Sequence, residues 1–266
     1  MHKTGMFASF DISKILTKAR RLVPFLPPQP ISPHGALTQD TCLIYSRLPP
    51  ELRLVIWESY IGAHAVHIYR RGTSKKLCAK ECSGWDTDDR GPHHNRCGSA
   101  NVQCNHITLL LTCKRMYFDF IHILYEHTAF DFSHGPATAG VMLKRLPATH
   151  LALITQVHIK WLARSPLDLD LRRPGRDEKI WIDLWEALAA MKRLKWLRVE
   201  LMPVVPMDGP VWVKREHTMC SVLRKVTSPE FFELVLPWPA GADAREETLP
   251  CSIVRKVPAY GHLFLV

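Results

Sequence analysis

The stretch QVHIKW, residues 156–161, decides the fold of this chain together with the segments that follow it. Its apolar residues alternate with Gln, His and Lys, which is the period of a β-strand with one buried face. The next segment, IWIDLWEALAAMKRL at residues 180–194, has apolar residues at the spacing of an amphipathic helix. It leads into WLRVEL at residues 196–201, which alternates like the first strand. This order of strand, helix and strand predicts an α/β fold.

The distances between the strands indicate how they are connected. A weaker helix at residues 217–226 and a third strand, FFELVLPW at residues 231–238, extend the order. The strand centres lie about 41 and 35 residues apart, which is long enough for helical crossovers between parallel strands. Such units can stack as an irregular array like a leucine-rich repeat (LRR) or form one small open α/β sheet. Because the spacing exceeds the roughly 20 to 29 residues of leucine-rich repeats, residues 136–266 are predicted to form an irregular, LRR-like helix-strand body.

Three tryptophans in this body are candidates for a structural or a binding role. Trp181, Trp185 and Trp196 lie in the helix and at the start of the strand that follows it. We expect them to pack the helix onto the sheet, and the alternative is an exposed aromatic anchor for a partner.

Two further helices are predicted before the body. In LPPELRLVIWESYIG, residues 48–62, Pro49 and Pro50 suit the first turn and Gly62 suits the end of a helix. A second and more apolar helix, ITLLLTCKRMYFDFIHILY at residues 107–125, is expected to be the central packing element. It is followed by TAFDFS, which reads as a short strand.

The positive charge of the chain is concentrated at its front. Residues 1–77 carry a formal charge of +7 out of the total of +10, so the basic character does not cover one folded face. Residues 1–40 are basic and rich in proline, and we expect a largely disordered tail with a partly helical segment at residues 10–23. The alternatives for this segment are a mitochondrial presequence or a helix on a membrane surface.

The composition also bears on the compartment. No apolar run typical of a secretory signal follows the start, and eight cysteines are too few for a disulfide scaffold. The longest uncharged run contains PFLPPQPISP, whose prolines cannot continue a membrane helix. We therefore expect an intracellular protein of the cytoplasm or nucleus without a transmembrane segment, with mitochondria as the alternative.

A polar segment at about residues 70–106 holds the residues best suited to bind a metal. Cys78 and Cys82 are separated by three residues, and His94 and Cys97 by two, both within the spacing of ligand pairs in structural zinc sites. These four residues are the predicted ligands of a structural zinc ion, which would order a polar loop. The alternative is an exposed loop with incidental thiols and no cofactor.

The order of motifs resembles a known family. LPPELRLVIWESYIG, a basic HIYRR, the Cys/His-rich loop, LLLTCKRMYFDFIHILYEHTAFDF and a late FFELVLPWP together look like a large fungal family of uncharacterised proteins. These proteins share a domain of unknown function and are often described as F-box-like. The resemblance covers roughly residues 41–255. It implies an F-box-like helical region at residues 41–135, packed as one unit with the LRR-like body.

The F-box comparison assigns a role to the first helix. Leu48, Pro49, Glu51, Leu52 and Ile56 match the opening of an F-box, and LLLTCKRMYFDF is similar to its later helix. About 45 residues lie between them, where an F-box has a short connection, but a longer surface loop costs little free energy to close. The resemblance implies that Leu48, Pro49, Leu52 and Ile56 bind the Skp-family adaptor of a cullin-RING ubiquitin ligase.

These patterns favour a binding protein over an enzyme. We find no catalytic motif, and Cys113 lies among apolar residues, where a buried thiol is the usual case. We expect a non-enzymatic protein-interaction module, with a body that recruits a substrate. The alternative is a zinc-stabilised module that binds nucleic acid or chromatin, and nucleic acid is the less favoured partner because no known nucleic-acid module is visible.

Overall fold

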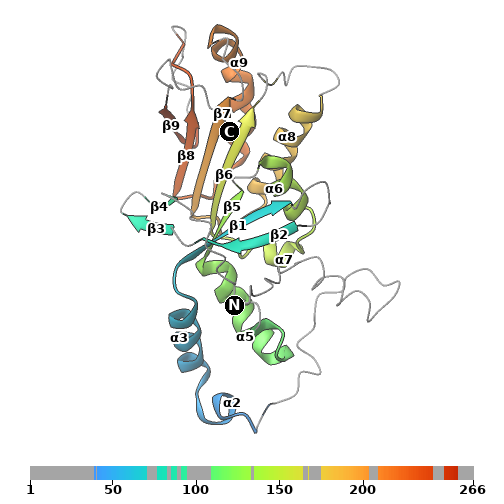
Figure 1. The fold of residues 1–266 in the computed structure, drawn as a ribbon, viewed down its shortest axis with the longest axis vertical. Helices are drawn as coiled ribbons and strands as arrows, with labels where there is room; N and C mark the ends of the chain where they lie inside the picture. Colours follow the sequence, from blue (N-terminus) through green and yellow to red (C-terminus); the bar gives the residue numbers. More distant parts are fainter. Residues whose placement is uncertain are drawn as a thin grey trace, which may run out of the picture.

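The computed structural model describes residue 39 and residues 41–70, 77–82, 85–88, 91–94, 109–132, 135–163, 167, 175–203, 209–241 and 249–256 (Figure 1). The predicted tail at residues 1–40, with its helical segment at residues 10–23, lies outside these described residues except for Gln39. Within the described part of the chain, no helix is both long and apolar enough to span a membrane.

One sheet connects the front of the chain to its end. In the described residues it has seven strands in the order β2-β1-β5-β6-β7-β8-β9. All neighbouring pairs are parallel except β1 with β2, which is antiparallel and lies at one edge. The strands are β1 (His64–Arg70), β2 (Leu77–Glu81), β5 (Thr128–Phe132), β6 (Gln156–Ala163), β7 (Trp196–Pro203), β8 (Phe231–Leu236) and β9 (Ser252–Arg255).

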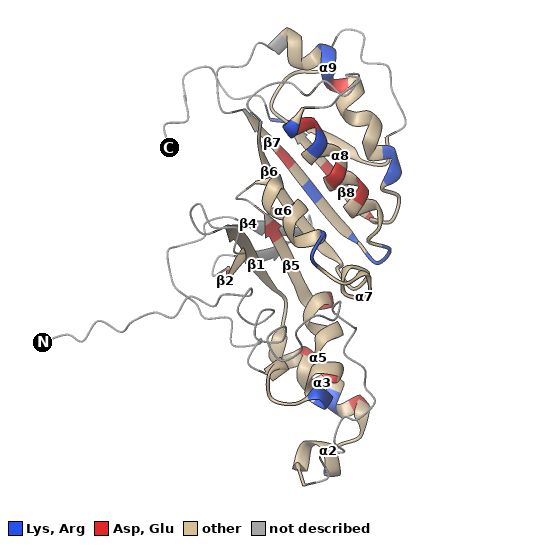
Figure 2. Cartoon of the chain, turned by 90° about the vertical axis from the view of Figure 1, so that its right-hand side faces the viewer, with Lys and Arg blue, Asp and Glu red and all other residues tan. Residues whose placement is uncertain are grey.

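The parallel strands follow one another in sequence, which confirms the predicted α/β order. The connecting helices are α6 (Pro136–Leu143), α7 (Ala148–Leu151), α8 (Arg176–Ala189), α9 (Gly209–Ser221) and the 3-10 helix η1 (Val222–Lys225). Figure 2 shows α6 and α8 in front of the strands, on the same side of the sheet. Their apolar residues form one cluster with the inward side chains of the strands, such as Val157 and Ile159. Parallel strands that follow one another in sequence, joined by crossovers of the usual right hand, are expected to place their helices on one face.

The helix α8 is the centre of this core. Trp181 and Trp185 are fully buried and contact each other with ring centroids 5.3 Å apart, so their predicted packing role is confirmed. Trp196 is also buried, but it stacks on Phe231 of the neighbouring strand. The expectation that residues 107–125 form the central packing element is wrong, because the buried residues Met116, Phe120 and Ile123 belong to a separate, smaller cluster.

A second, smaller cluster forms below the sheet in Figure 1. It joins α3 (Pro50–Ile61) to α5 (Lys114–His127), and the short α2 (Leu43–Arg47) precedes them. The predicted helix at residues 48–62 is confirmed: Pro50 opens α3, and Gly62 ends it with a φ of 58°, a left-handed value that favours glycine. The ring of Trp57 meets the ring of Phe120 edge to face, with centroids 6.0 Å apart.

Part of the predicted Cys/His-rich loop is strand. β2 adds an edge to the main sheet, and β3 (Trp85–Asp88) pairs with β4 (Gly91–His94) in a separate antiparallel ribbon. The segment LCAKE is too short for its alternating pattern to be recognised within a polar sequence. Its hydrogen-bonded pairing with β1 stabilises it as a strand. β1, β2 and β5 therefore share one sheet with the strands of residues 136–266.

Candidate functional site

Helix α3 has a buried face and an exposed apolar face. Arg53, Trp57 and Ile61 are buried. Trp57 and Ile61 belong to the smaller cluster between α3 and α5, which we call the lower cluster. Four apolar side chains of the same helix are exposed, with exposed fractions of 42 to 59%. We call them the apolar stripe: Leu52, Val55, Ile56 and Tyr60.

A buried charge holds α3 in this orientation. The guanidinium of Arg53 donates to the carbonyl oxygen of Leu48 at 3.0 Å and lies 3.4 Å from the carboxylate of Asp119 on α5. The same group stands over the ring of Tyr45, 5.0 Å from its centroid. Tyr45 in turn donates its hydroxyl to the sulfur of Met116 at 3.8 Å. The buried face of α3 is thus fixed by polar contacts as well as by packing.

Three of the four predicted partner-binding residues are exposed, and the fourth is half-buried. Leu52 and Ile56 belong to the apolar stripe, and Pro49 is exposed at the N-cap of α3. Leu48 is half-buried, and its carbonyl binds Arg53. Val55 and Tyr60 complete the stripe but were absent from the predicted set, although their helical spacing from Leu52 was a signal for them.

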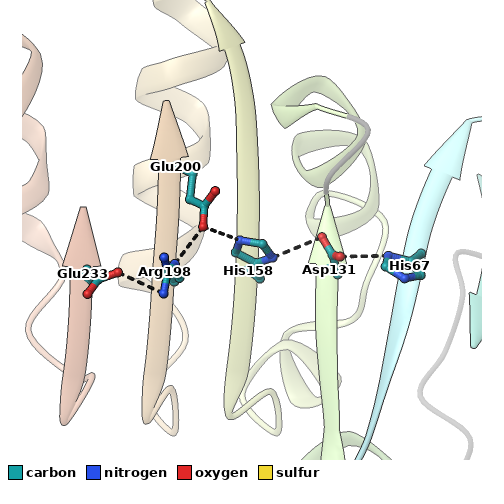
Figure 3. Close-up of polar contacts among 6 residues, drawn as sticks. All are labelled: His67, Asp131, His158, Arg198, Glu200 and Glu233. Atoms are coloured by element: carbon teal, nitrogen blue, oxygen red, sulfur yellow. Dashed lines mark hydrogen bonds and ion pairs between the residues drawn. The ribbon is translucent and has the colours of Figure 1, made fainter. Parts of the chain in front are cut away.

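Besides the apolar stripe, the structure has a row of polar side chains on the face of the sheet opposite α6 and α8. Because successive side chains of a strand point to opposite faces, residues that alternate with the core positions face away from α8. The pairing places His67, Asp131, His158, Arg198 and Glu233 next to one another on five consecutive strands. We define the polar row as these five residues and Glu200, all drawn in Figure 3.

Short contacts link the polar row from strand to strand (Figure 3). The two oxygens of Asp131 face two histidines: Oδ2 lies 2.8 Å from Nδ1 of His67, and Oδ1 lies 3.4 Å from Nδ1 of His158. The other ring nitrogen of His158, Nε2, lies 3.5 Å from Oε1 of Glu200. Asp131 has no exposed surface, and His158 is 4% exposed. A charged group at this depth requires partners of opposite charge.

Arg198 extends the polar row to β8. Its Nε lies 2.8 Å from Oε1 of Glu200, and its Nη1 lies 3.1 Å from Oε1 of Glu233. One guanidinium therefore bridges two carboxylates on neighbouring strands. The planar group suits such double pairing better than an ammonium does.

The polar row shifts two protonation equilibria. Burial acts to lower the pKa of His158, but the contacts and charges of Asp131 and Glu200 outweigh it and raise the pKa above its ordinary value. Burial acts to raise the pKa of Glu200, but the contact and charge of His158 outweigh it. The charges of Arg198 and Lys160 act in the same direction, and the pKa of Glu200 falls to about 2.

The sequence prediction missed the polar row because it treated the strands one at a time. His158 was expected on the polar side of a strand with one buried face, but both faces of β6 are buried at this point. A signal was present in the sequence: a charged or titratable residue stands between apolar residues in each of TAFDF, QVHIK, WLRVE and FFELV. Alignment of these strands as parallel neighbours would have brought the residues together.

The predicted zinc ligands are divided between strands. Cys78 lies in β2 and Cys82 directly after it, and both are buried. His94 ends β4, but its side chain and the whole of Cys97 lie outside the described residues. Residues four apart on an extended strand are separated by about 13 Å, whereas zinc binds each sulfur at about 2.3 Å. A zinc ion shared by Cys78 and Cys82 would require β2 to rearrange.

The remaining candidates are other groups of metal-binding side chains and the thiol of Cys113. Among the residues that the structure describes, no group of three or more His, Cys, Asp or Glu side chains is arranged to hold a metal ion. Cys113 is the N-cap of α5 instead of an internal core residue, and its half-buried sulfur accepts the backbone N–H of Met116 at 3.4 Å. The thiol therefore has a capping role at the start of the helix.

Comparison with known proteins assigns a family. A family model described as "Domain of unknown function (DUF7730)" matches residues 37–257, which is most of the chain. No curated protein and no solved structure shows a significant match. The matched range contains the apolar stripe, both helices of the lower cluster and every strand of the main sheet. The chain belongs to the DUF7730 family, whose shared domain has no assigned function.

Proposed function

We propose that this protein is a non-enzymatic interaction module of the F-box-like kind, in which the apolar stripe of α3 binds a Skp-family adaptor of a ubiquitin ligase. The observation that carries the proposal is the exposure of Leu52, Val55, Ile56 and Tyr60 on one face of a helix. Single exposed apolar residues are ordinary on a protein surface, but a contiguous face of them marks an interaction site. An amphipathic helix that lays such a face into a hydrophobic groove is a common mode of recognition.

The surroundings of the stripe support this role. Glu51 and Glu58 are exposed on the same helix beside the stripe, so an apolar centre has a polar border, as in known interfaces. The opposite face is already anchored by Trp57 and Arg53. A partner could therefore bind α3 without displacing it from α5, and little free energy would be lost to reorganisation.

The sheet supports the second half of the proposal. We infer an LRR-like body that recruits a substrate to the ligase. In its favour, consecutive parallel strands are joined by helices that gather on one face of the sheet. This order is that of stacked strand-helix units, which offer extended surfaces to partners.

The test is co-purification of the full chain with a Skp-family adaptor. Leu52→Asp places a charge in the N-terminal part of the stripe, and we expect it to weaken binding by about tenfold or more, as charges in desolvated contacts do. The matched control is Glu58→Ala, which changes an exposed residue of the same helix outside the stripe and should bind like the wild type.

The fold of each variant is checked by circular dichroism and thermal unfolding. Because Leu52 is exposed, Leu52→Asp should unfold at nearly the wild-type temperature. Failure of the folded wild-type chain to bind the adaptor would remove this mechanism. Equal loss of binding in Leu52→Asp and Glu58→Ala would show that the stripe is not the contact surface.

A further inference from the structure

The polar row contains a histidine whose position requires a charge. Both ring nitrogens of His158 face carboxylate oxygens, Nδ1 toward Asp131 and Nε2 toward Glu200. A neutral imidazole carries one N–H donor and one lone pair, so one of these contacts would set a lone pair against an acceptor. An imidazolium carries an N–H on both nitrogens, so both contacts become ion pairs between opposite charges.

The charges around His158 favour the same state. From β5 it faces Asp131, and from β7 it faces Glu200 and Arg198. Its own strand places Gln156 and Lys160 on the same face, two residues away on each side. Beyond these neighbours, the described part of the polar row continues with His67 on β1 and Glu233 on β8.

The balance of positive and negative charge in the polar row depends on its histidines. Its three carboxylates belong to Asp131, Glu200 and Glu233, and Arg198 is its permanent cation. Arg198 is shared between Glu200 and Glu233, while Asp131 contacts the two histidines His67 and His158. A proton on His158 therefore supplies positive charge at the point where the row passes from β5 to β7.

We propose that His158 is a proton-operated clasp, which joins β5, β6 and β7 across the face of the sheet opposite α6 and α8 when it is charged and releases this contact when it loses the proton. The device makes the cohesion of the central strands depend on the acidity of the surroundings. It is independent of the apolar stripe on α3, so it holds whether or not the adaptor binds.

The direction of the pH dependence follows from the raised pKa of His158. A group whose pKa is higher in the folded than in the unfolded chain binds its proton more tightly when folded. Its stabilising contribution is complete below the ordinary histidine value of 6.5 and is lost as the pH rises through the folded pKa. The clasp is closed in mildly acidic solution and opens toward alkaline pH.

The direct test is an NMR titration of the histidine rings of the full chain from about pH 5 to about pH 9. We expect the His158 ring to titrate with a midpoint above 6.5, and to carry protons on both nitrogens below that midpoint. In Glu200→Gln, which keeps the shape but removes one facing charge, the midpoint should move down. Through-bond assignment on the wild type makes the first result independent of any variant.

A stability measurement separates the clasp from a merely structural histidine. The unfolding free energy of the wild type should fall between pH about 6 and pH about 9, and His158→Gln should remove this fall in whole or large part. The matched control is His122→Gln, which changes a half-buried histidine of α5 outside the row and should keep the wild-type slope. A His158 midpoint at or below 6.5, or a wild-type slope retained in His158→Gln, would overturn the proposal.

Discussion

At the scale of single residues, two tryptophans of α8 differ in one hydrogen bond. Trp181 and Trp185 are both fully buried, one turn apart on the same helix. The indole N–H of Trp181 donates to the carbonyl oxygen of Met219 at 3.0 Å. The indole N–H of Trp185 has no hydrogen-bond partner in the described part of the chain. Burial of a donor without a partner is unfavourable, so the two side chains contribute differently to stability.

This difference gives a prediction for two matched substitutions. Trp181→Phe and Trp185→Phe remove a similar apolar volume from the same core, but only the first breaks an indole hydrogen bond. We expect Trp181→Phe to cost about 1 to 3 kcal/mol more in the free energy of unfolding. Chemical denaturation of both variants measures the difference. Equal losses would mean that the hydrogen bond contributes nothing net.

At the scale of elements, the helices show where residue patterns succeed and fail. The spacing of Leu52, Val55, Ile56 and Tyr60 predicted α3 correctly as a helix. It could not identify the buried face, because the more apolar face is the exposed one and α3 packs through Trp57 and a buried Arg53. Apolar periodicity predicts that one face of a helix is apolar. It does not predict whether the chain itself or a partner covers that face.

The strand β2 gives the prediction at this scale. Cys78 lies in β2 and Cys82 follows the last residue of this strand, and four residues of extended chain span about 13 Å. Because one zinc ion binds each sulfur at about 2.3 Å, we expect Cys78→Ser to leave the metal content of the purified chain unchanged. Elemental analysis of the wild type, Cys78→Ser and Cys82→Ser after dialysis measures this. A stoichiometric zinc content that is lost in both variants would contradict the strand geometry and support the predicted site.

At the scale of the whole molecule, one sheet unites the regions that the sequence separates. Helix α5 runs directly into β5, so the lower cluster and the sheet share a continuous backbone at Thr128. The side chain of Thr128 closes this junction, with its hydroxyl 3.0 Å from Nε2 of His64 on β1. The polar row then crosses five strands of the same sheet. Protonation of His158 or Glu200 therefore acts on contacts between strands of the sheet and not within one loop.

The acid limit of stability is the prediction for the whole molecule. The pKa of Glu200 is lowered to about 2 from an ordinary value of 4.5, so its contribution is complete above 4.5 and is lost as the pH falls toward 2. We expect the wild type to lose at most about 3 kcal/mol through this group. Glu200→Gln should remove that part of the acid dependence. Denaturation curves from about pH 5 to about pH 2 test it, and an unchanged acid slope in Glu200→Gln would contradict it.

Together the two shifts define a range of maximum stability. Above the ordinary pKa of glutamate Glu200 keeps its full contribution, and below the ordinary pKa of histidine His158 does so as well. The combined stabilising contribution of His158 and Glu200 is therefore greatest between pH 4.5 and pH 6.5.

The sequence by itself determined the α/β class, the parallel crossovers after residue 156 and the helical stretch at residues 48–62. These follow from local periodicity, from connection lengths and from proline and glycine at the ends of a helix, all of which act within about 40 residues. The tertiary structure alone decided that β1, β2 and β5 join the same sheet, which face of α3 is exposed, and that six polar residues meet across five strands. The physical reason is that these features depend on which distant segments become neighbours, since the pairing of His67 with Asp131 and of Asp131 with His158 is set by strand register and not by any local pattern.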